Sequence, residues 1–556
     1  MSRKRDEGVQ KIDFSDDFLI DSAERRFQNG DYFGALSLLN KREERGMPNA
    51  DAFALAADIY ESLELYHMAA DSWFRFLDTC NEADFGEGYE GLAVAFMNMG
   101  EDFEAAMFYR KMFVADGASP DEIPEFEESD FAKPPMRVLP SGEEEYAEYL
   151  AEGEIALKET DFDRAHVSFQ KVPKHSKYYA TAGGYAALCT LLNGEEEKAQ
   201  SECEDILKEY PDNVQTLITY CAALGADKKK DEARAVAEKL AEVETSDPDE
   251  LYRIATALCE TELNEDAYRV LTKLVEGKYC NDETVLYFHA VAAYKTGRIE
   301  EAIESLTRRC TLYPRGVVAQ YYLQQLRKLR DGSGERFEMG YIYNLPAEEF
   351  NRRASLILKV FTSEQEEAER YCDMPDIEDY FRVAVDAMDG RDSKFLTIAV
   401  RAAVKCRCDN FVREMLLSFD GNLLAKFIAM GDLAVRNEEN TFGVVIFNAY
   451  KEYHTHALDI GTRKQRQFLC AFGEVYSRFS TLGETECEDK MTLAAEDVYS
   501  VLESARAWEL MDEREALAAA IYREARLPHG ARGLKEIAGL FNADVDTLRK
   551  ILNYLV

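Results

Sequence analysis

The sequence has no uninterrupted apolar run of the roughly 18 residues that a membrane-spanning helix requires. Its first residues, Met1-Ser-Arg-Lys-Arg, lead into polar sequence and not into the apolar core of a secretory signal peptide. These two absences favour a soluble, cytoplasmic protein.

Regularly spaced cysteines are also missing. The twelve cysteines follow no even framework, and Cys406 and Cys408 are the only close pair. Because residues two apart on a helix point to nearly opposite sides, this pair is not expected to share a metal ion. Other cysteines occupy predicted helix-packing positions, where a small apolar residue is needed. We therefore expect reduced thiols in the core and no disulfides.

Signatures of catalysis and of cofactor binding are equally scarce. The chain has no Gly-rich phosphate loop, no Gly-x-Ser-x-Gly turn and no Cys-x-x-Cys metal motif. The one cluster of histidines is His454-Thr-His456, to which the same geometric argument against a shared metal ion applies. From these absences we expect no enzyme activity, no catalytic residue, no cofactor and no metal site.

Negative charge, in contrast, is in excess. The chain has 66 Lys and Arg against 106 Asp and Glu, a net charge of −40, and most of it lies before residue 346. Such a surface disfavours nucleic acids and anionic membranes and favours basic partners, although a role in solubility alone explains it as well. With 46% hydrophobic and 11% aromatic residues, the chain is expected to fold.

A unit of about 34 residues recurs along the chain, with small residues at two positions that are twelve residues apart. The second position holds Ala35, Ala69, Ala105, Ala165, Ala199, Ala233, Ala267 and Ala302. The first position holds Ala23, Ala57, Ala93, Gly153, Ala187, Cys221, Ala255 and Ala290. Two short amphipathic helices per unit bury their apolar faces only by stacking on neighbouring units, and small residues permit the close crossings.

The clearest unit carries the residues Leu286, His289, Ala290, Ala293, Gly297, Ile299, Ala302, Leu306 and Pro314. This pattern resembles the tetratricopeptide repeat (TPR) family. The resemblance implies an all-α superhelical solenoid of about eight helical hairpins. The repeats are expected at 16–49, 50–83, 86–119, 146–179, 180–213, 214–247, 248–282 and 283–316, with a capping helix at 317–330.

Two breaks divide this pattern. Residues 120–145 are acidic and rich in proline, which prevents a regular helix, so we expect a solvated linker or, alternatively, a tethered segment that lies in a groove. Asp331-Gly-Ser-Gly334 marks a second linker. The expected parts are a polar tail at 1–15, repeats 1–3 at 16–119, a linker at 120–145, repeats 4–8 with the cap at 146–330, a linker at 331–345 and a C-terminal domain at 346–556.

The C-terminal domain is also expected to be helical, as an array of helical hairpins without a clean repeat. No alternating strand pattern is visible. Helical spacing occurs at 350–361, 377–388, 395–405, 411–419, 444–448, 468–479 and 494–510.

The TPR resemblance further implies that the first helix of each hairpin lines a concave groove. Carried over to this chain, the groove begins with acidic residues and continues with apolar and aromatic ones. The expected partner-binding residues are Asp51, Asp58, Glu87, Leu157, Leu188, Leu191, Tyr252, Tyr287 and Tyr294. Such a groove suits a peptide or helix with basic and apolar residues. The alternative is that these apolar side chains pack against the C-terminal domain.

A second resemblance lies at residues 534–552, which look like a DNA-binding helix-turn-helix. Ala538 would allow the helix crossing, Asp544 would cap the second helix, and Arg549 and Lys550 would contact DNA. Asp544 and Asp546 would repel phosphates at the same end. The sequence therefore predicts a non-enzymatic scaffold that binds a protein partner in the TPR groove. The alternative is a TPR-containing transcriptional regulator that binds DNA through this C-terminal motif.

Overall fold

The structure is a computed structural model that divides into two compact units. Unit 1 combines residues 1–126 with 344–556, and unit 2 comprises residues 127–343. The described residues are 16–43, 49–119, 144–158, 160–374, 376–386, 393–419, 421–436, 441–446, 448–454, 471–473, 475, 488–526, 533–541 and 543–555. The predicted tail at 1–15 and nearly all of the predicted linker at 120–145 lie outside them.

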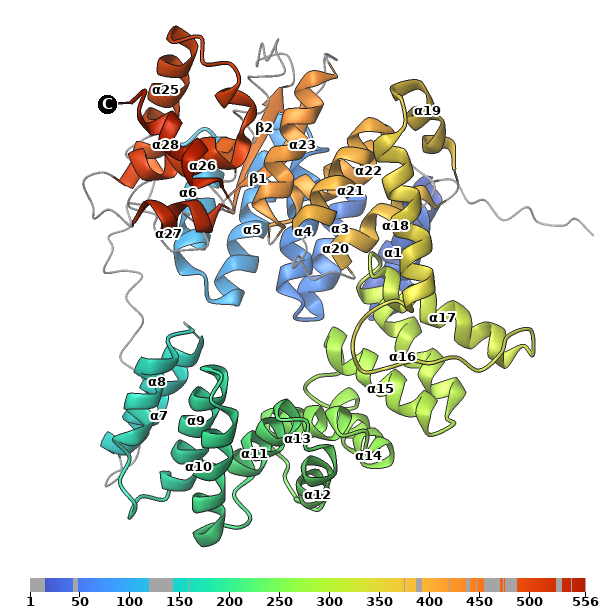
Figure 1. The fold of residues 1–556 in the computed structure, drawn as a ribbon. Coiled ribbons are helices and arrows are strands. Elements are labelled where there is room, and N and C mark those ends of the chain that lie inside the picture. Colours follow the sequence, from blue (N-terminus) through green and yellow to red (C-terminus); the bar gives the residue numbers. More distant parts are fainter. Residues whose placement is uncertain are drawn as a thin grey trace, which may run out of the picture. The chain divides into compact units, whose positions relative to one another are not determined.

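Unit 2 is a row of antiparallel helical hairpins, which follow one another from α7 to α17 in Figure 1. The helices are α7 (Glu144–Lys158), α8 (Phe162–Gln170), α9 (Tyr179–Leu192), α10 (Glu196–Glu209), α11 (Val214–Ala226), α12 (Lys230–Ala241), α13 (Pro248–Glu260), α14 (Asn264–Val275), α15 (Glu283–Lys295), α16 (Ile299–Leu312) and α17 (Val317–Arg330). The side chains of Asn213, Asp247 and Asp282 cap α11, α13 and α15 by accepting hydrogen bonds from main-chain amides of the first turn.

Unit 1 begins with three further hairpins of the same kind. Their helices are α1 (Asp16–Gln28), α2 (Tyr32–Glu43), α3 (Ala50–Ser62), α4 (Tyr66–Leu77), α5 (Phe85–Met99) and α6 (Asp102–Ala115), with a short 3₁₀ helix η1 (Glu82–Asp84) before α5. Gly91 of α5 lies against the indole of Trp73, and a Cβ atom at Gly91 would lie 2.1 Å from Trp73 Cε2. The glycine therefore allows α4 and α5 to pack closely.

The turn inside each of the eight hairpins holds one residue in the left-handed conformation, with φ between +56° and +84°. These residues are Gly30, Glu64, Gly100, Thr160, Gly194, Lys228, Glu262 and Gly297. A left-handed residue ends the first helix and reverses the chain. Four of the eight are not glycine, so this turn is only partly visible in the sequence.

The small residues of the repeat lie at the helix crossings. The eight alanines from Ala35 to Ala302 have exposed fractions of 5% or less, and the residues at the first position are buried as well. At Gly153, a Cβ atom would lie 2.4 Å from Cε1 of Phe169. The two helices of a hairpin therefore approach each other too closely for a larger side chain.

The rest of unit 1 is largely helical. Its elements are α18 (Ala347–Thr362), α19 (Gln365–Glu369), η4 (Arg370–Asp373), α20 (Ile377–Asp386), α21 (Ser393–Lys405), α22 (Asp409–Leu417), α23 (Leu423–Val435), β1 (Thr441–Ile446), β2 (Ala449–His454), α25 (Glu488–Ser504), η6 (Leu510–Asp512), α26 (Arg514–Arg526), α27 (Leu534–Leu540) and α28 (Val545–Leu552). The residues of α26 from Ala516 to Tyr522 are all buried, in a core formed with α25, α27 and α28.

Strands β1 and β2 form an antiparallel hairpin, with Thr441 opposite His454 and Ile446 opposite Ala449. The expectation of no strands, with a helix at 444–448, is wrong here. Four consecutive residues of β1, from Phe442 to Val445, are buried. Because both faces of the strand are covered, its sequence lacks the alternation by which strands are recognised.

The N-terminal hairpins and the C-terminal region of unit 1 pack against each other. Asp78, just after α4, accepts hydrogen bonds from the Gly443 main-chain amide (2.7 Å) and from Arg413 Nη1 (3.2 Å). The hydroxyl of Tyr450 donates to the carbonyl of Leu77 (3.3 Å), and its ring lies edge-on to that of Phe85. In Figure 1, α4, α22 and β1 are correspondingly close. The expected division into separate domains at 16–119 and 346–556 is therefore replaced by a single unit.

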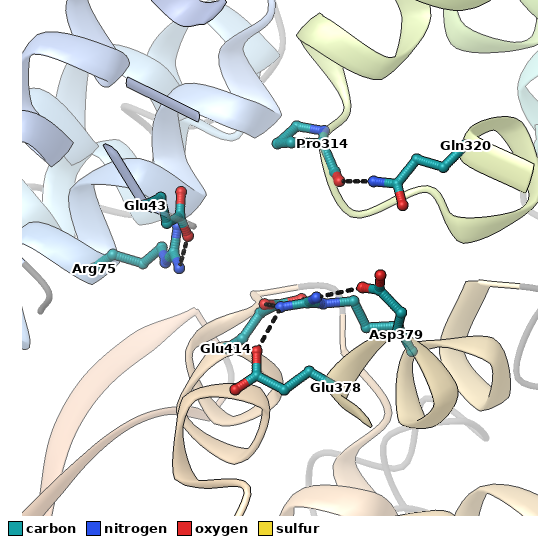
Figure 2. A network of polar contacts seen from close by, with 8 residues as sticks. Glu43, Arg75, Pro314, Gln320, Glu378, Asp379 and Glu414 are labelled. Atoms are coloured by element: carbon teal, nitrogen blue, oxygen red, sulfur yellow. Dashed lines mark hydrogen bonds and ion pairs between the residues drawn. The ribbon is translucent and has the colours of Figure 1, made fainter. Parts of the chain in front are cut away.

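Ion pairs fix several of these helices. The guanidinium of Arg382 on α20 contacts Glu378 (3.2 Å), Asp379 (2.7 Å) and, on α22, Glu414 (2.9 Å). Figure 2 shows the three carboxylates converging from both helices. It also shows the ion pair of Arg75 with Glu43, which joins α4 to the end of α2. In unit 2, the figure shows the hydrogen bond that the Gln320 side-chain amide donates to the Pro314 carbonyl.

Candidate interaction surfaces

The first helices of the hairpins in unit 2 share one face, which we call the inner face. Arg253 on α13 shows their proximity, because its Nη1 donates to the hydroxyl of Tyr185 on α9 (2.8 Å) and to Gln215 on α11. The ring of Tyr185 stacks on Phe169 at a centroid distance of 5.2 Å. Burial raises the pKa of Tyr185, and the guanidinium of Arg253 opposes this shift. A polar chain thus connects three consecutive repeats.

At the α15 end of the inner face, the predicted groove residues Tyr287 and Tyr294 contact another part of the chain. The Tyr294 hydroxyl donates to the carbonyl of Phe337 (2.6 Å) and accepts a hydrogen bond from the Phe337 amide (3.0 Å). The Tyr287 hydroxyl donates to the carbonyl of Gly340 (3.0 Å). Tyr287 is only 1% exposed, and burial raises its pKa. Both tyrosines therefore bind the main chain of residues 337–343, which we call the resident segment.

Side chains of the resident segment alternate between the inner face and solvent. Phe337 stacks on Tyr294 (4.8 Å between ring centroids), and Tyr343 packs edge-on against Tyr287 (4.9 Å). Between them, Met339 is 3% exposed, whereas Ile342 is 76% exposed. The segment forms neither helix nor strand. It is therefore bound as an irregular, largely extended peptide with a bend at Tyr341 and Ile342.

The resident segment lies within the predicted linker at 331–345, although its sequence carries a signal of an ordered segment. Large apolar side chains occupy every second position in Phe337, Met339, Tyr341 and Tyr343. This spacing is typical of an extended chain with one covered face. The third predicted aromatic groove residue, Tyr252, is on α13 and packs against a different residue. The centroid of its ring lies 5.3 Å from that of Tyr279.

Nearer to α7, the inner face presents apolar side chains. The predicted groove residues Leu157, Leu188 and Leu191 are half-buried. Leu192 is 49% exposed. Because Leu188 and Leu192 follow Tyr185 by three and seven residues on α9, the three side chains share one helix face. These leucines form an apolar patch beside the polar chain of Arg253.

The predicted acidic residues Asp51, Asp58 and Glu87 all lie in unit 1, on α3 and α5, and all three are exposed. Desolvation and the nearby carboxylates of Asp58, Asp84 and Asp51 raise the pKa of Glu87. Desolvation and Glu61 raise the pKa of Asp58. The carboxylates of Asp51 and Asp58 are therefore close enough to repel that of Glu87.

The side chains of Cys406 and Cys408 lie close together, whereas they were predicted to point to opposite sides of a helix. Arg407 adopts a left-handed φ of +64° just after α21, which bends the chain and brings the sulfur atoms of Cys406 and Cys408 to 3.1 Å. The two cysteines do not point to opposite sides of a helix, because α21 ends at Lys405, before the pair. In the described part of the chain, no three His, Cys, Asp or Glu side chains are grouped to hold a metal ion. His454 ends β2, and His456 lies outside the described residues.

The terminal helices α27 and α28 pack onto α26. Ala538, Leu548 and Leu552 are buried, and Asp544 caps α28 by accepting a hydrogen bond from the Thr547 amide (2.8 Å). Arg549 and Lys550 are exposed, and Arg549 pairs with Asp546 at 2.6 Å. Asn542, which the predicted turn included, lies outside the described residues. The hairpin thus has a clear structural role.

Known proteins show only a weak similarity to this chain. No protein-family model and no curated protein matches the chain. Among solved structures, MamA MSR-1 is 18% identical, with 31% of this chain and 97% of MamA covered at a TM-score of 0.24. The C-terminal part of a TPR repeat-containing protein from Cytophaga hutchinsonii is 15% identical, with 55% and 99% covered at a TM-score of 0.18.

The hairpins α1–α6 of unit 1 and α7–α16 of unit 2 form arrays of stacked helices, which is the all-α fold that the TPR resemblance implied. The eight helical hairpins, their left-handed turns and their buried small residues carry this assignment. No helix among the described residues is long and apolar enough to cross a membrane.

Proposed function

We propose that this protein is a non-enzymatic scaffold that binds a partner protein on the inner face of unit 2. TPR-like arrays are suited to protein–protein interaction because stacked hairpins create an extended surface. The observation that carries the proposal is the resident segment, an extended stretch of protein held by the tyrosines of α15. The same face continues with the exposed or half-buried leucines of α7 and α9.

The partner that fits this face is a peptide or helix with apolar anchors. Leu157, Leu188 and Leu191 would cover such anchors. The acidic residues Asp51, Asp58 and Glu87 of unit 1 form a separate surface that suits basic residues of the same or another partner. We expect no catalytic role and no cofactor for either surface.

A comparison of two charge substitutions tests the proposal. Leu188→Glu together with Leu191→Glu places charge on the inner face, whereas Val167→Glu places it on α8, where Val167 is 56% exposed. Partners captured by the full-length protein are identified by mass spectrometry. A partner that binds the inner face is lost with the leucine variant and retained with Val167→Glu. Equal recovery of every partner by both variants would show that the inner face is not the binding surface.

Among the described residues of the terminal hairpin, no contact favours the alternative of DNA binding. The exposed Arg549 pairs with Asp546, and Asp544 is committed to capping α28. Both carboxylates lie at the end of the helix that would approach the phosphates.

A further inference from the structure

The resident segment is bound as a peptide ligand is bound. Its main chain is held by the hydroxyls of Tyr287 and Tyr294, which would serve any sequence equally well. Its inward-facing side chains each contact a different part of the inner face. In peptide recognition by extended chains, main-chain hydrogen bonds give affinity, and pockets for alternate side chains give specificity. Both components are present here within a single chain.

Each inward side chain has its own surroundings. The ring of Phe337 lies between Tyr294 and Tyr322, at centroid distances of 4.8 and 5.9 Å. The ring of Tyr341 packs edge-on against Phe288 (5.7 Å), and its hydroxyl donates to Asn264 Oδ1 (2.8 Å). These surfaces favour aromatic side chains over aliphatic ones, because ring pairs contribute more than their buried area alone.

Two cations add to this preference. The ammonium group of Lys295 lies 5.4 Å from the ring centroid of Tyr341, and the guanidinium of Arg309 lies 4.5 Å from that of Tyr343. Cations near the face of an aromatic ring are attracted by its electron density. Arg309 is 3% exposed, so its interaction is little screened by water.

We propose that this end of the inner face is a binding site for extended segments with aromatic side chains at alternate positions. The resident segment occupies it as an exchangeable ligand, and a partner's segment of the same pattern takes its place. The inference rests on the proposed function, because it identifies the chemistry of a partner for that same face.

The attachment of the resident segment determines what a partner must supply. It follows α17 after a short turn in which Gly332 has a φ of +71°, so it is tethered close to the site. A tether of this length gives an effective concentration in the millimolar range. A free peptide with the same contacts therefore competes poorly with it. An effective partner needs further contacts, which the leucines of α7 and α9 are placed to provide.

A labelled peptide tests this site in the full-length protein. The probe is a fluorescein-labelled peptide with the sequence of residues 335–345, and its binding is measured by fluorescence anisotropy. The protein variant Phe337→Ala with Tyr341→Ala weakens the resident segment and leaves the groove intact. The control is Ile342→Ala, because Ile342 points to solvent and is 76% exposed.

We expect the double variant to bind the probe at least tenfold more tightly than the wild type or Ile342→Ala. A probe with alanine at the positions of Phe337 and Tyr341 should bind at least tenfold more weakly than the original. Absence of probe binding by a double variant with unchanged circular dichroism would overturn the proposal. That result would not affect a partner whose binding depends on Leu188 and Leu191. The two proposals can therefore be rejected independently.

Hydrogen exchange of the wild-type protein provides a second test that needs no substitution. The Phe337 amide is bonded to the Tyr294 hydroxyl, so its exchange reports release of the segment. We expect it to exchange at least tenfold faster than the slowest amides of α15. Exchange of both at the same rate would mean that the segment leaves only when the unit unfolds, which contradicts an exchangeable ligand.

Discussion

Asp78 accepts a hydrogen bond from the main-chain amide of Gly443 at 2.7 Å, although the two residues are 365 positions apart. Its side chain is only 8% exposed and also pairs with Arg413. Desolvation raises the pKa of Asp78, while Arg413 and the Gly443 amide lower it. This carboxylate joins the second hairpin to the β-hairpin of unit 1.

Asp78→Ala should therefore destabilise unit 1. It leaves the Gly443 amide and the Arg413 guanidinium without a shared acceptor in a largely buried place, which costs about 1–3 kcal/mol. Chemical denaturation monitored by circular dichroism measures the change. Asp84→Ala is the matched control, since Asp84 is exposed in η1, and it should change the free energy of unfolding by less than about 0.5 kcal/mol. Equal effects of the two substitutions would contradict the role assigned to Asp78.

Ala302→Leu should overpack a helix crossing in unit 2. Ala302 has an exposed fraction of 0%, so the added carbon atoms must displace neighbours at a cost of roughly 1–3 kcal/mol. Glu304→Leu introduces the same side chain at an exposed position of the same helix and should have little effect. The comparison is made by denaturant titration, and matching midpoints for both variants would refute the repeat alignment at this position.

Gly297→Ala tests the left-handed turns. Gly297 has a φ of +84°, and a Cβ atom there would meet nothing within 4 Å, so the cost is conformational and amounts to about 1 kcal/mol. Lys228 occupies the equivalent turn with a φ of +62°, and Lys228→Gly should be neutral or slightly stabilising. Thermal unfolding of both variants checks the opposite signs. A stabilising Gly297→Ala would be incompatible with this geometry.

Stability should fall as the pH is lowered, because His289 is buried in its neutral form. Its exposed fraction is 5%, and desolvation lowers its pKa from 6.5 to about 4. In the unfolded chain, His289 is protonated below about pH 6.5. In the folded chain, it is protonated only below about pH 4. Between pH 7 and 5, this linkage costs about 2 kcal/mol.

The measurement is the free energy of unfolding at several pH values, for the wild type and for His289→Gln. In the wild type, His289 is hydrogen-bonded to Ser305 (2.7 Å) and Thr272 (3.2 Å), and glutamine is a polar residue that carries no charge at any of these pH values. The variant removes only the titration of this residue, so its curve should be flatter. Parallel curves would show that His289 does not titrate between these pH values.

Arg549→Ala should leave binding to duplex DNA unchanged and weak. The terminal hairpin has a core role through Leu548 and Leu552, and the chain carries a net charge of −40. Electrophoretic mobility shift at several salt concentrations provides the measurement. Nanomolar, sequence-selective binding that is lost with Arg549→Ala would instead favour the transcriptional regulator.

The sequence predicted the hairpins well because their information is local. The expected repeats at 214, 248 and 283 begin where α11, α13 and α15 begin, at Val214, Pro248 and Glu283. Caps, turns and small crossing residues are separated by a few positions and recur, so a single chain displays them repeatedly.

The features that the sequence analysis missed depend on distant contacts. Strand β1 is buried by packing that no local pattern records, and the convergence of Cys406 with Cys408 depends on one left-handed residue, Arg407. Tyr287 was predicted to bind a partner, and its contact with residues of the same chain could not be known from α15 alone. The alternating side chains of 337–343 suggested an extended segment and gave no indication of where it would bind.

Unit 1 can be completed only late in synthesis, because its two parts are far apart in the sequence. Asp78 is made 335 residues before Arg413, its partner in the folded unit. At the usual rate of 5–20 residues per second, roughly 20 to 70 seconds pass before the C-terminal half is made. During that time the first three hairpins have left the ribosome, while the surface around Phe85 and Tyr89 still lacks the β-hairpin that later covers it. Until the β-hairpin is made, this uncovered surface is open to aggregation and to binding by chaperones.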